Sequence, residues 1–299
     1  MKRTLKRLVF NVLLAGLAFS AFACAAQTPS IPVAQPSSPS PAPTLQATPT
    51  LPAVPTPAQP SPTMTKPCAE TKGQIQSLSF PGKDGYSTIE FELYLPPCYG
   101  KQTSKTYPLL ILLHGSGSDK NQWPSLGLAK AMDQKIAQGM PPFLVACPTI
   151  ENIRGDLYKI TDFVGQEIPG YLARHYALRP GRDNLALGGL SYGAIWTLRT
   201  ATRFPERFAK LGMHSTAVDA PDMVAFSHAI LALPYNQKPQ ILIDTGQMDE
   251  YRWSATKLDE VLNHDGIAHQ WVYQPGYHEP GYWSENLPSY LDFYACGWN

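Results

Sequence analysis

Apolar residues in the second part of this chain recur with two different periods, one typical of strands and one typical of helices. Short apolar runs predict strands at residues 74–80, 89–95, 109–113, 143–147, 185–188, 209–213, 241–244 and 270–273. Helical spacing predicts helices at residues 126–138, 157–176, 192–203 and 251–263. Alternating strands and helices favour a parallel sheet with helices on both faces. We therefore predict an α/β fold with a mostly parallel sheet of about eight strands.

The first two predicted strands are joined through Pro-Gly-Lys-Asp-Gly at residues 81–85, which predicts an N-terminal antiparallel hairpin. If the turn centres on Lys83, partner residues have numbers that sum to about 166. Cys68 and Cys98 have that sum, so we predict a disulfide between them. Closing this loop would stabilise the fold by roughly 3–4 kcal/mol in the loop-entropy model. Cys147 and Cys296 are left as a second possible pair, with no register argument behind it.

The first 67 residues differ in composition from the rest. Residues 1–26 carry four basic residues and then an apolar run from Leu8 to Ala23, which predicts an export signal. Cys24 follows Ala-Phe-Ala in a pattern that resembles a lipobox, so we predict lipidation of Cys24. Cleavage near Ala25 or Ala26, which would release a secreted protein, is the alternative.

Residues 27–67 have proline at 13 of 41 positions and few bulky apolar residues. Such a segment cannot build a core, so we predict a disordered tether. The catalytic or binding domain is then residues 68–299. Without the signal, 20 basic residues face 23 acidic ones, and this charge gives no support for binding nucleic acid.

The sequence Gly189-Leu190-Ser191-Tyr192-Gly193 has the G-x-S-x-G spacing of a nucleophile elbow. An apolar strand precedes it and a helical pattern follows, which is the context that the motif requires. The helix N-terminus would direct N–H groups and partial positive charge at an oxyanion beside Ser191. We therefore predict that Ser191 is a nucleophile.

A serine nucleophile needs a base and an acid, which in this arrangement follow it in the order acid, then histidine. The histidines after the serine are His214, His228, His264, His269 and His278. Only His278 lies in a loop just after a final predicted strand, so we predict that it is the base. Asp249 is our choice for the acid because it lies in the loop beyond a strand, whereas Asp244 ends that strand. Asp244 and Glu250 remain alternatives.

A tetrahedral intermediate also needs hydrogen-bond donors. The N–H of Tyr192 is the first predicted donor, and the N–H of Ser116, in the loop His114-Gly115-Ser116-Gly117, is the second. We predict a structural role for His114. The aromatic residues Trp123, Tyr192, Tyr277 and Trp283 could line an acyl or aryl pocket, although such residues near a sheet edge are more often core.

Residues 91–293 resemble the esterase D-like family of α/β-hydrolases, which includes feruloyl esterases, acetyl xylan esterases and mycolyltransferases. The matching segments are residues 94–99, 114–117 with Asp119 and Trp123, 182–193, 204–208, 214–215, and His278 with Trp283. The resemblance implies the α/β-hydrolase fold and serine ester hydrolysis. It does not fix the substrate, and it departs at Ala194, where many relatives have glycine.

We therefore predict an exported serine carboxylesterase that needs no metal or organic cofactor. A feruloyl or acetyl esterase of saccharides is the narrower form of this prediction. Its partner is a small-molecule or saccharide ester, and membrane contact is expected only through the N-terminal lipid. The alternatives are an acyltransferase of the mycolyltransferase type and a non-catalytic binding lipoprotein on a hydrolase scaffold. The oligomeric state is left open.

Overall fold

The computed structural model describes residues 68–101, 104–150 and 157–299. The predicted export signal at residues 1–26, the lipidation of Cys24 and the tether at residues 27–67 lie outside these residues. Among the described residues, no helix is both long enough and apolar enough to cross a membrane.

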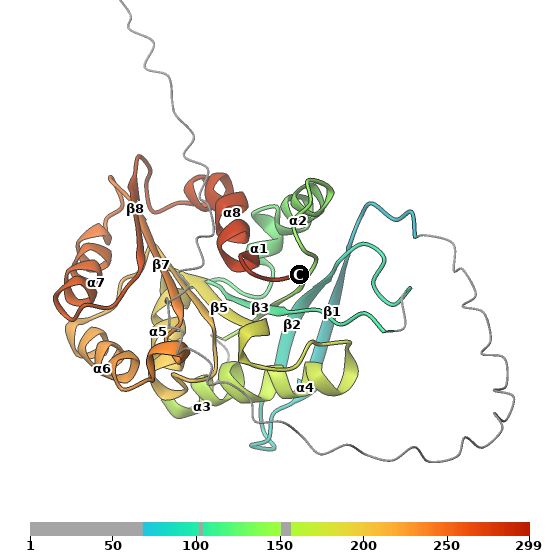
Figure 1. The fold of residues 1–299 in the computed structure, drawn as a ribbon, viewed down its shortest axis with the longest axis horizontal. Coiled ribbons are helices and arrows are strands. Elements are labelled where there is room, and N and C mark those ends of the chain that lie inside the picture. Colours follow the sequence, from blue (N-terminus) through green and yellow to red (C-terminus); the bar gives the residue numbers. More distant parts are fainter. Residues whose placement is uncertain (1–67, 102–103, 151–156) are drawn as a thin grey trace, which may run out of the picture. The chain divides into compact units, whose positions relative to one another are not determined.

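The described residues form a sheet of eight strands in the order β1-β2-β4-β3-β5-β6-β7-β8 (Figure 1). The strands are β1 (Gln74–Pro81), β2 (Thr88–Leu95), β3 (Leu109–Leu113), β4 (Leu144–Pro148), β5 (Leu185–Leu190), β6 (Lys210–His214), β7 (Gln240–Gly246) and β8 (Gln270–Gln274). β1 and β2 are antiparallel to their neighbours, and β3 to β8 are parallel. The predicted α/β-hydrolase architecture is confirmed.

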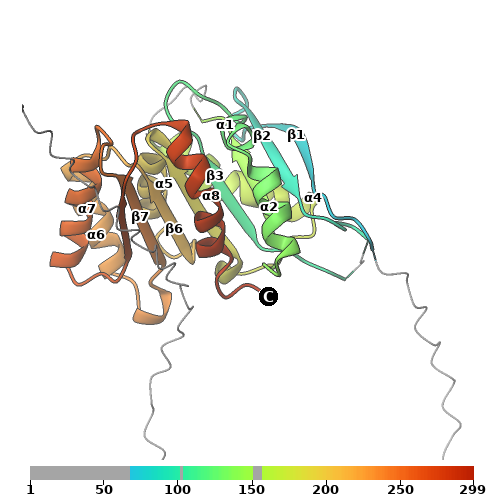
Figure 2. The same cartoon turned by 90° about the horizontal axis from the view of Figure 1, so that it is seen from above.

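Helices cover both faces of the sheet (Figures 1 and 2). One face carries α3 (Leu157–Asp162), the π-helical turn η1 (Phe163–Glu167), α4 (Ile168–His175), α5 (Tyr192–Arg203), α6 (Ala220–Leu231) and α7 (Arg252–His264). The other face carries α1 (Gln122–Ser125), α2 (Leu128–Ala137) and α8 (Pro280–Ala295). Short 3₁₀ turns, η2 (Arg182–Asn184) and η3 (Tyr235–Gln237), precede β5 and β7.

The central strand β3 shows why a continuous apolar run predicts a strand in this chain. Leu109, Ile111 and Leu113 belong to the apolar cluster on the α5 face, and Leu110 and Leu112 belong to the cluster on the α8 face. Successive side chains of a strand point to opposite faces, so a strand that is buried on both faces must be apolar throughout.

Two helical predictions differ in detail from the structure. The helix predicted at residues 126–138 begins only at Leu128, as α2, because Gly127 before it has a left-handed φ of 94°, and the short helix α1 precedes the predicted segment. The segment 157–176 contains α3, η1 and α4 in succession. The helical pattern of the sequence predicts neither α6 nor the bounds of α8.

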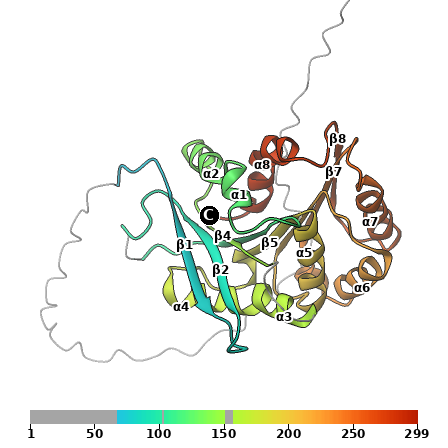
Figure 3. The same cartoon turned by 180° about the vertical axis from the view of Figure 1, so that it is seen from behind.

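The predicted hairpin exists, but its register is wrong by three residues. Gln74 pairs with Leu95 and Phe80 with Ile89. The turn closes with the N–H of Gly82 donating to the carbonyl of Ser87 at 2.7 Å. The Asp84 side chain accepts hydrogen bonds from the N–H groups that follow it, and this shifts the centre of the turn beyond Lys83. Figure 3 shows the hairpin at the end of the sheet remote from β7 and β8.

The predicted Cys68–Cys98 disulfide is confirmed, with the two Cα atoms 5.8 Å apart. Cys68 precedes β1, so the disulfide joins the chain outside the strand ladder rather than across it. The possible Cys147–Cys296 pair is wrong. Within the described residues Cys147 is a free, buried thiol on β4, where it pairs in register with Glu92 of β2 and packs into the core on the α8 face.

A buried carboxylate joins β6, β7 and α8. Asp244, on β7, is 1% exposed, and its Oδ1 lies 2.5 Å from Nδ1 of His214 on β6. Its Oδ2 accepts hydrogen bonds from the hydroxyls of Tyr282 (2.9 Å) and Tyr290 (2.7 Å) on α8. A buried charge is tolerated when its lone pairs are satisfied in this way. Burial, with the adjacent Asp244 charge, raises the pKa of both tyrosines, so both remain hydrogen-bond donors.

A third tyrosine of α8 reaches the same cluster over the paired strands β5 and β6. The Tyr294 hydroxyl lies 3.0 Å from Nε2 of His214. It occupies space that glycine leaves open on two strands, since a Cβ at Gly188 would lie 1.8 Å from this hydroxyl oxygen and a Cβ at Gly212 would lie 1.9 Å from it. We call His214, Asp244, Tyr282, Tyr290 and Tyr294 the buried polar cluster.

We predict strong coupling between Gly188 and Tyr294. Gly188→Ala should destabilise the fold by about 3 kcal/mol through overpacking, and Tyr294→Phe by about 1–2 kcal/mol through the lost hydrogen bond. The phenylalanine removes the clashing oxygen. The double variant should therefore lose less unfolding free energy than the two single variants lose together, by about 1 kcal/mol or more. Urea unfolding measures all three values.

The control pairs Gly188→Ala with Tyr94→Phe. Tyr94 is a buried tyrosine whose hydroxyl donates to Asp133. It lies on β2, which β4 and β3 separate from Gly188 on β5, so these two changes should be additive. Additivity of Gly188→Ala with Tyr294→Phe would contradict the steric account.

Candidate active site

Ser191 lies between the end of β5 and the start of α5, where the chain turns sharply. Its φ of 53° and ψ of −118° are strained for a residue with a side chain. Its N–H donates to the carbonyl of His214 at 2.8 Å, which helps to hold the turn. The side chain is partly exposed and stands at the carboxyl edge of the parallel strands.

The two outer glycines of the motif are required by close backbone contacts. A Cβ at Gly189 would lie 2.5 Å from the carbonyl of Gly193, and a Cβ at Gly193 would lie 2.4 Å from the carbonyl oxygen of Leu113. Real Cβ atoms essentially never approach this closely. The two glycines of the G-x-S-x-G motif are therefore required because β3, β5 and α5 approach one another closely at this point.

Ser191, His278 and Asp249 lie in one hydrogen-bonded chain. Nε2 of His278 is 2.9 Å from Oγ of Ser191. Nδ1 of His278 is 2.9 Å from Oδ2 of Asp249 and 3.1 Å from Oδ1. A neutral imidazole with its proton on Nδ1 satisfies all these contacts, because Nε2 can then accept the proton of the serine hydroxyl.

The environment of Asp249 favours its charged form. Burial raises the pKa of this fully buried carboxyl, but hydrogen bonds from His278, from the N–H of Tyr251 and from the Ser215 hydroxyl outweigh burial, and the net pKa is lowered. A lowered pKa in the folded state contributes stability above the pKa of the unfolded state, about 3.9. That contribution is lost as the pH falls through the folded-state pKa.

The other two candidate acids lie elsewhere. Asp244 is held in the buried polar cluster by His214 and two tyrosines. Glu250 is exposed. Among the histidines, His264 is paired with Asp265 and His269 with Asp259, both away from Ser191.

The loop between β3 and α1 passes beside Ser191. A Cβ at Gly115 would lie 3.5 Å from the Cβ of Ser191, and the N–H of Gly115 donates to Oε1 of Gln122 at 2.7 Å. The next residue, Ser116, is exposed. Tyr192 is the first residue of α5, where backbone N–H groups have no acceptor within the helix. Both predicted oxyanion donors thus belong to backbone next to Ser191.

Buried contacts tie this loop to the sheet. Nε2 of His114 accepts the N–H of Ile150 at 2.9 Å, which leaves Nδ1 to donate to the carbonyl of Gly115. Lys120 forms an ion pair with the buried Glu92 of β2 at 3.0 Å. His114 therefore has the structural contacts expected of it, and these contacts fix the loop that carries Ser116.

The predicted aromatic pocket needs correction. Trp123 is 1% exposed and its Nε1 donates to the carbonyl of Leu113, so it packs in the core. Trp283 is also buried, and its ring stands edge-on to His278 with centroids 5.0 Å apart. Tyr277 is 55% exposed and can meet a ligand. The sequence analysis did not identify two residues near the site. The ring of Tyr251 also contacts His278, with centroids 4.8 Å apart, and Ser215 influences the pKa of Asp249.

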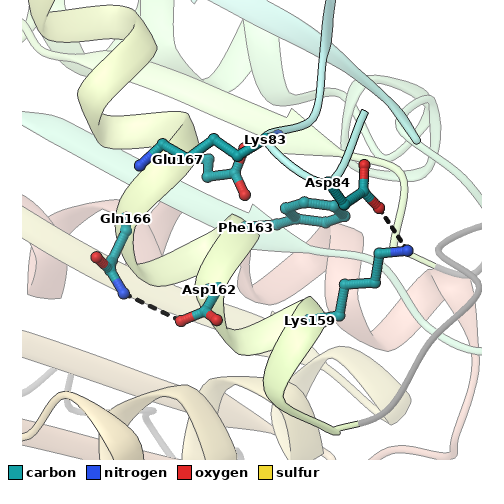
Figure 4. A pocket seen from close by; sticks show the side chains of 7 residues that line it. All are labelled: Lys83, Asp84, Lys159, Asp162, Phe163, Gln166 and Glu167. Atoms are coloured by element: carbon teal, nitrogen blue, oxygen red, sulfur yellow. Dashed lines mark hydrogen bonds and ion pairs between the residues drawn. The ribbon is translucent and has the colours of Figure 1, made fainter. Parts of the chain in front are cut away.

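A charged cavity of about 360 Å³ lies between the hairpin turn and the α3–η1 segment (Figure 4). Its polar groups already have partners: Lys159 pairs with Asp84, and the Glu167 carboxylate accepts the N–H of Lys83. Asp162 pairs with Arg203, at the far end of α5 from Ser191. That helix of 12 residues separates the two ends by about 18 Å, so we assign the cavity no part in the Ser191 site.

One group among the described residues has the composition of a metal site, namely Cys68, Glu70 and Cys98. Its two sulfur atoms are joined in the disulfide. Thiolates are the metal-binding form of cysteine, so the oxidised pair does not supply them.

Comparison with known proteins adds a family to this geometry. Residues 86–293 match the model of a family described as "Putative esterase". An endo-1,4-beta-xylanase/feruloyl esterase of Xylanibacter ruminicola is 29% identical over 172 residues, which are 53% of this chain and 24% of that protein. The chain thus spans about a quarter of the length of that relative.

Solved structures share the fold at lower identity. A ferulic acid esterase superposes with a TM-score of 0.67 and 18% identity, covering 75% of this chain and 98% of that one. A fluorophosphonate-binding serine hydrolase of Staphylococcus aureus superposes with a TM-score of 0.65 and 18% identity, covering 75% and 99%. At such identities the likeness shows the fold.

We predict opposite effects for the two buried aspartates. Asp249→Asn should slow the reaction of Ser191 with a fluorophosphonate by about 10³-fold, because the imidazole loses its orientation, and should change stability little. Asp244→Asn should destabilise the fold by about 3 kcal/mol or more, because an amide cannot accept all three hydrogen bonds. Labelling rates and urea unfolding measure both. A slower labelling rate for Asp244→Asn than for Asp249→Asn would reverse the assignment.

Proposed function

This chain belongs to the matched family of putative esterases, and from that premise we propose that it is a serine hydrolase whose catalytic triad consists of Ser191, His278 and Asp249. The observation that carries the proposal is the continuous hydrogen-bonded chain from the Ser191 hydroxyl through His278 to the Asp249 carboxylate. The partly exposed, strained position of Ser191 supports it, since a nucleophile must reach its substrate.

The proposed reaction begins with attack by Oγ of Ser191 on the ester carbonyl carbon while its proton moves to Nε2 of His278. Asp249 stabilises the imidazolium that forms. The carbonyl oxygen becomes an oxyanion that accepts hydrogen bonds from the N–H groups of Tyr192 and Ser116. Collapse breaks the bond to the alcohol, which takes the proton from His278 and leaves an acyl-enzyme.

Water completes the proposed cycle. His278 removes a proton from the water as it attacks the acyl carbonyl, and the Ser191 oxygen recovers that proton as the acid leaves. Each step uses groups that the chain itself supplies. If a sugar or lipid hydroxyl replaced water, the same acyl-enzyme would give acyl transfer, so analysis of products with water and with alcohol acceptors separates these two reactions.

We further propose that the substrate is a feruloyl or acetyl ester of a saccharide. The support is the relative named as a xylanase/feruloyl esterase and the fold neighbour named as a ferulic acid esterase. The exposed ring of Tyr277, next to His278, offers an apolar surface for an aryl acid or a sugar ring.

We predict that Ser191→Ala abolishes ester turnover and fluorophosphonate labelling while the melting temperature stays close to that of the wild type. The reason is that the change removes only the nucleophile. The assay uses feruloyl, acetyl-sugar and short acyl esters on the purified domain. Ser284→Ala, a serine of α8 whose hydroxyl donates to the Leu126 carbonyl, is the control and should keep full turnover. Residual turnover in Ser191→Ala would refute the mechanism.

We also propose that the protein is exported and that Cys24 is lipidated. The support is the basic and apolar pattern of residues 1–26 and the Cys68–Cys98 disulfide, a bond typical of oxidising compartments. In a bacterial host, the mature chain should begin at lipid-modified Cys24 and fractionate with membranes, and Cys24→Ala should abolish the modification. Intact-mass measurement decides this, and an unmodified N-terminus at Ala25 or Ala26 would favour free secretion.

A further inference from the structure

Gly115 is the pivot of the loop that carries the proposed oxyanion donor, Ser116. It is buried, and a Cβ at this position would lie 2.9 Å from Cδ1 of Leu190 and 3.5 Å from Cβ of Ser191. The backbone of the loop thus passes close to the proposed nucleophile. A glycine has no side chain to restrict its two backbone torsions, so contacts from other residues must hold the peptide planes on either side of it.

The peptide plane that follows Gly115 is held by contacts within the loop. The carbonyl of Gly115 accepts hydrogen bonds from Nδ1 of His114 at 2.8 Å and from the N–H of Ser118 at 3.3 Å. A trans peptide is planar, and its N–H points away from its carbonyl oxygen. The two contacts therefore also set the direction of the Ser116 N–H, which belongs to the same peptide.

The peptide plane that precedes Gly115 is held by a side chain of α1. The N–H of Gly115 donates to Oε1 of Gln122 at 2.7 Å. A backbone N–H needs an acceptor, so this contact fixes which atom of the Gln122 amide faces the loop. Gln122 opens α1, and its own N–H donates to the carbonyl of Asp119 at 3.1 Å. The next residue, Trp123, is buried, and its Nε1 donates to the carbonyl of Leu113 at 3.0 Å, so α1 is anchored to the end of β3.

We propose that Gln122 is a positioning residue for the oxyanion site, because it holds the Gly115 pivot from which the Ser116 N–H extends. The proposal rests on the proposed function of the triad and of this loop. Gln122 acts through the backbone and not on the reacting atoms. With the N–H of Gly115 held by Gln122 and its carbonyl held by His114, both torsions of the glycine are fixed. Without the Gln122 oxygen, the peptide before Gly115 can rotate, and the Ser116 N–H moves with it.

Two substitutions separate the hydrogen bond from the size of the side chain. Gln122→Met keeps an unbranched side chain of similar length and good helix propensity, but a thioether is only a weak acceptor. Gln122→Glu keeps a carboxylate oxygen that can accept the N–H of Gly115. If Gln122 acted only through packing, Gln122→Met should be tolerated at least as well as Gln122→Glu. A positioning hydrogen bond requires the opposite order.

The test measures kcat and KM for ester hydrolysis and the rate at which a fluorophosphonate labels Ser191. For Gln122→Met we expect kcat and the labelling rate to fall by about 10- to 100-fold, less than the ~10²–10³-fold loss that follows removal of an oxyanion donor. KM should stay nearly unchanged, because the oxyanion forms only after the substrate has bound. Gln122→Glu should stay within about threefold of the wild type in about 1 M salt, where a Debye length of ~3 Å screens the added charge.

Gln166 provides a matched control. Its side-chain amide also makes a hydrogen bond, to Oδ1 of Asp162 at 3.0 Å, and it lies in η1 on the lining of the charged cavity. Gln166→Met makes the same chemical change as Gln122→Met, so it should leave kcat, KM and the labelling rate unchanged. A wild-type kcat in Gln122→Met would overturn the proposal, and so would a loss in Gln122→Glu as large as that in Gln122→Met.

The proposal and the function on which it depends can fail separately. If Ser191→Ala is inactive but Gln122→Met matches the wild type in kcat, only the positioning role is wrong. If the wild type neither turns over an ester nor reacts with the fluorophosphonate, the proposed function fails, and the backbone amide NMR resonance of Ser116 still tests the contact. Movement of that resonance in Gln122→Met, with recovery in Gln122→Glu, would support the positioning role, and an unmoved resonance would overturn it.

Discussion

The geometry of this protein depends on one buried charge, the carboxylate of Asp244. It is 1% exposed and accepts hydrogen bonds from His214 on β6 and from Tyr282 and Tyr290 on α8. A carboxylate in the interior is tolerated only with such a full set of donors, so β6, β7 and α8 have one favourable arrangement relative to one another. These hydrogen bonds fix β7 and α8, next to which the proposed triad residues Asp249 and His278 lie.

The residues of the proposed triad lie next to the ends of β5, β7 and α8. Ser191 follows β5, Asp249 lies in the loop after β7, and His278 lies in the loop between β8 and α8. A small rotation of α8 would carry His278 away from Ser191, and the buried polar cluster opposes that rotation. The two strained serines, Ser191 and Ser215, follow adjacent strands, and the N–H of each is held by the next strand in the sheet. Two of the three described non-glycine residues with a positive φ thus lie at the edge where the proposed chemistry takes place, and the third is Cys98 of the disulfide.

The loop that carries Ser116 is anchored by a different part of the fold. Lys120 in this loop pairs with Glu92 of β2, and His114 accepts the N–H of Ile150 after β4. The antiparallel strand β2 therefore supports the proposed oxyanion site, although it contributes no residue to the triad. The Cys68–Cys98 disulfide closes the β1–β2 pair at the end away from the hairpin turn and limits the motion of both strands. The N-terminal hairpin therefore helps to hold the loop that carries Ser116.

The sequence by itself determined those features that depend on local pattern. Continuous apolar runs such as residues 109–113 identified strands buried on both faces, and the glycines around Ser191 identified a turn that no larger residue could make. The position of His278 after the last strand and of Asp249 beyond a strand end selected the two residues that the fold brings to Ser191.

Only the tertiary structure decided features that depend on contacts between distant residues. The hairpin register is set by the Asp84 side chain within its turn, and the free state of Cys147 follows from the direction in which β4 points its thiol. Trp123 and Trp283 are buried because α1 and α8 pack against the sheet, and the Trp283 indole meets the Ser215 hydroxyl across 68 positions of the chain. Contacts of this kind cannot be predicted from residue type and local spacing, because such contacts depend on how whole helices and strands pack against one another. The sequence therefore determined which residues could form the site, and packing decided what surrounds and orients them.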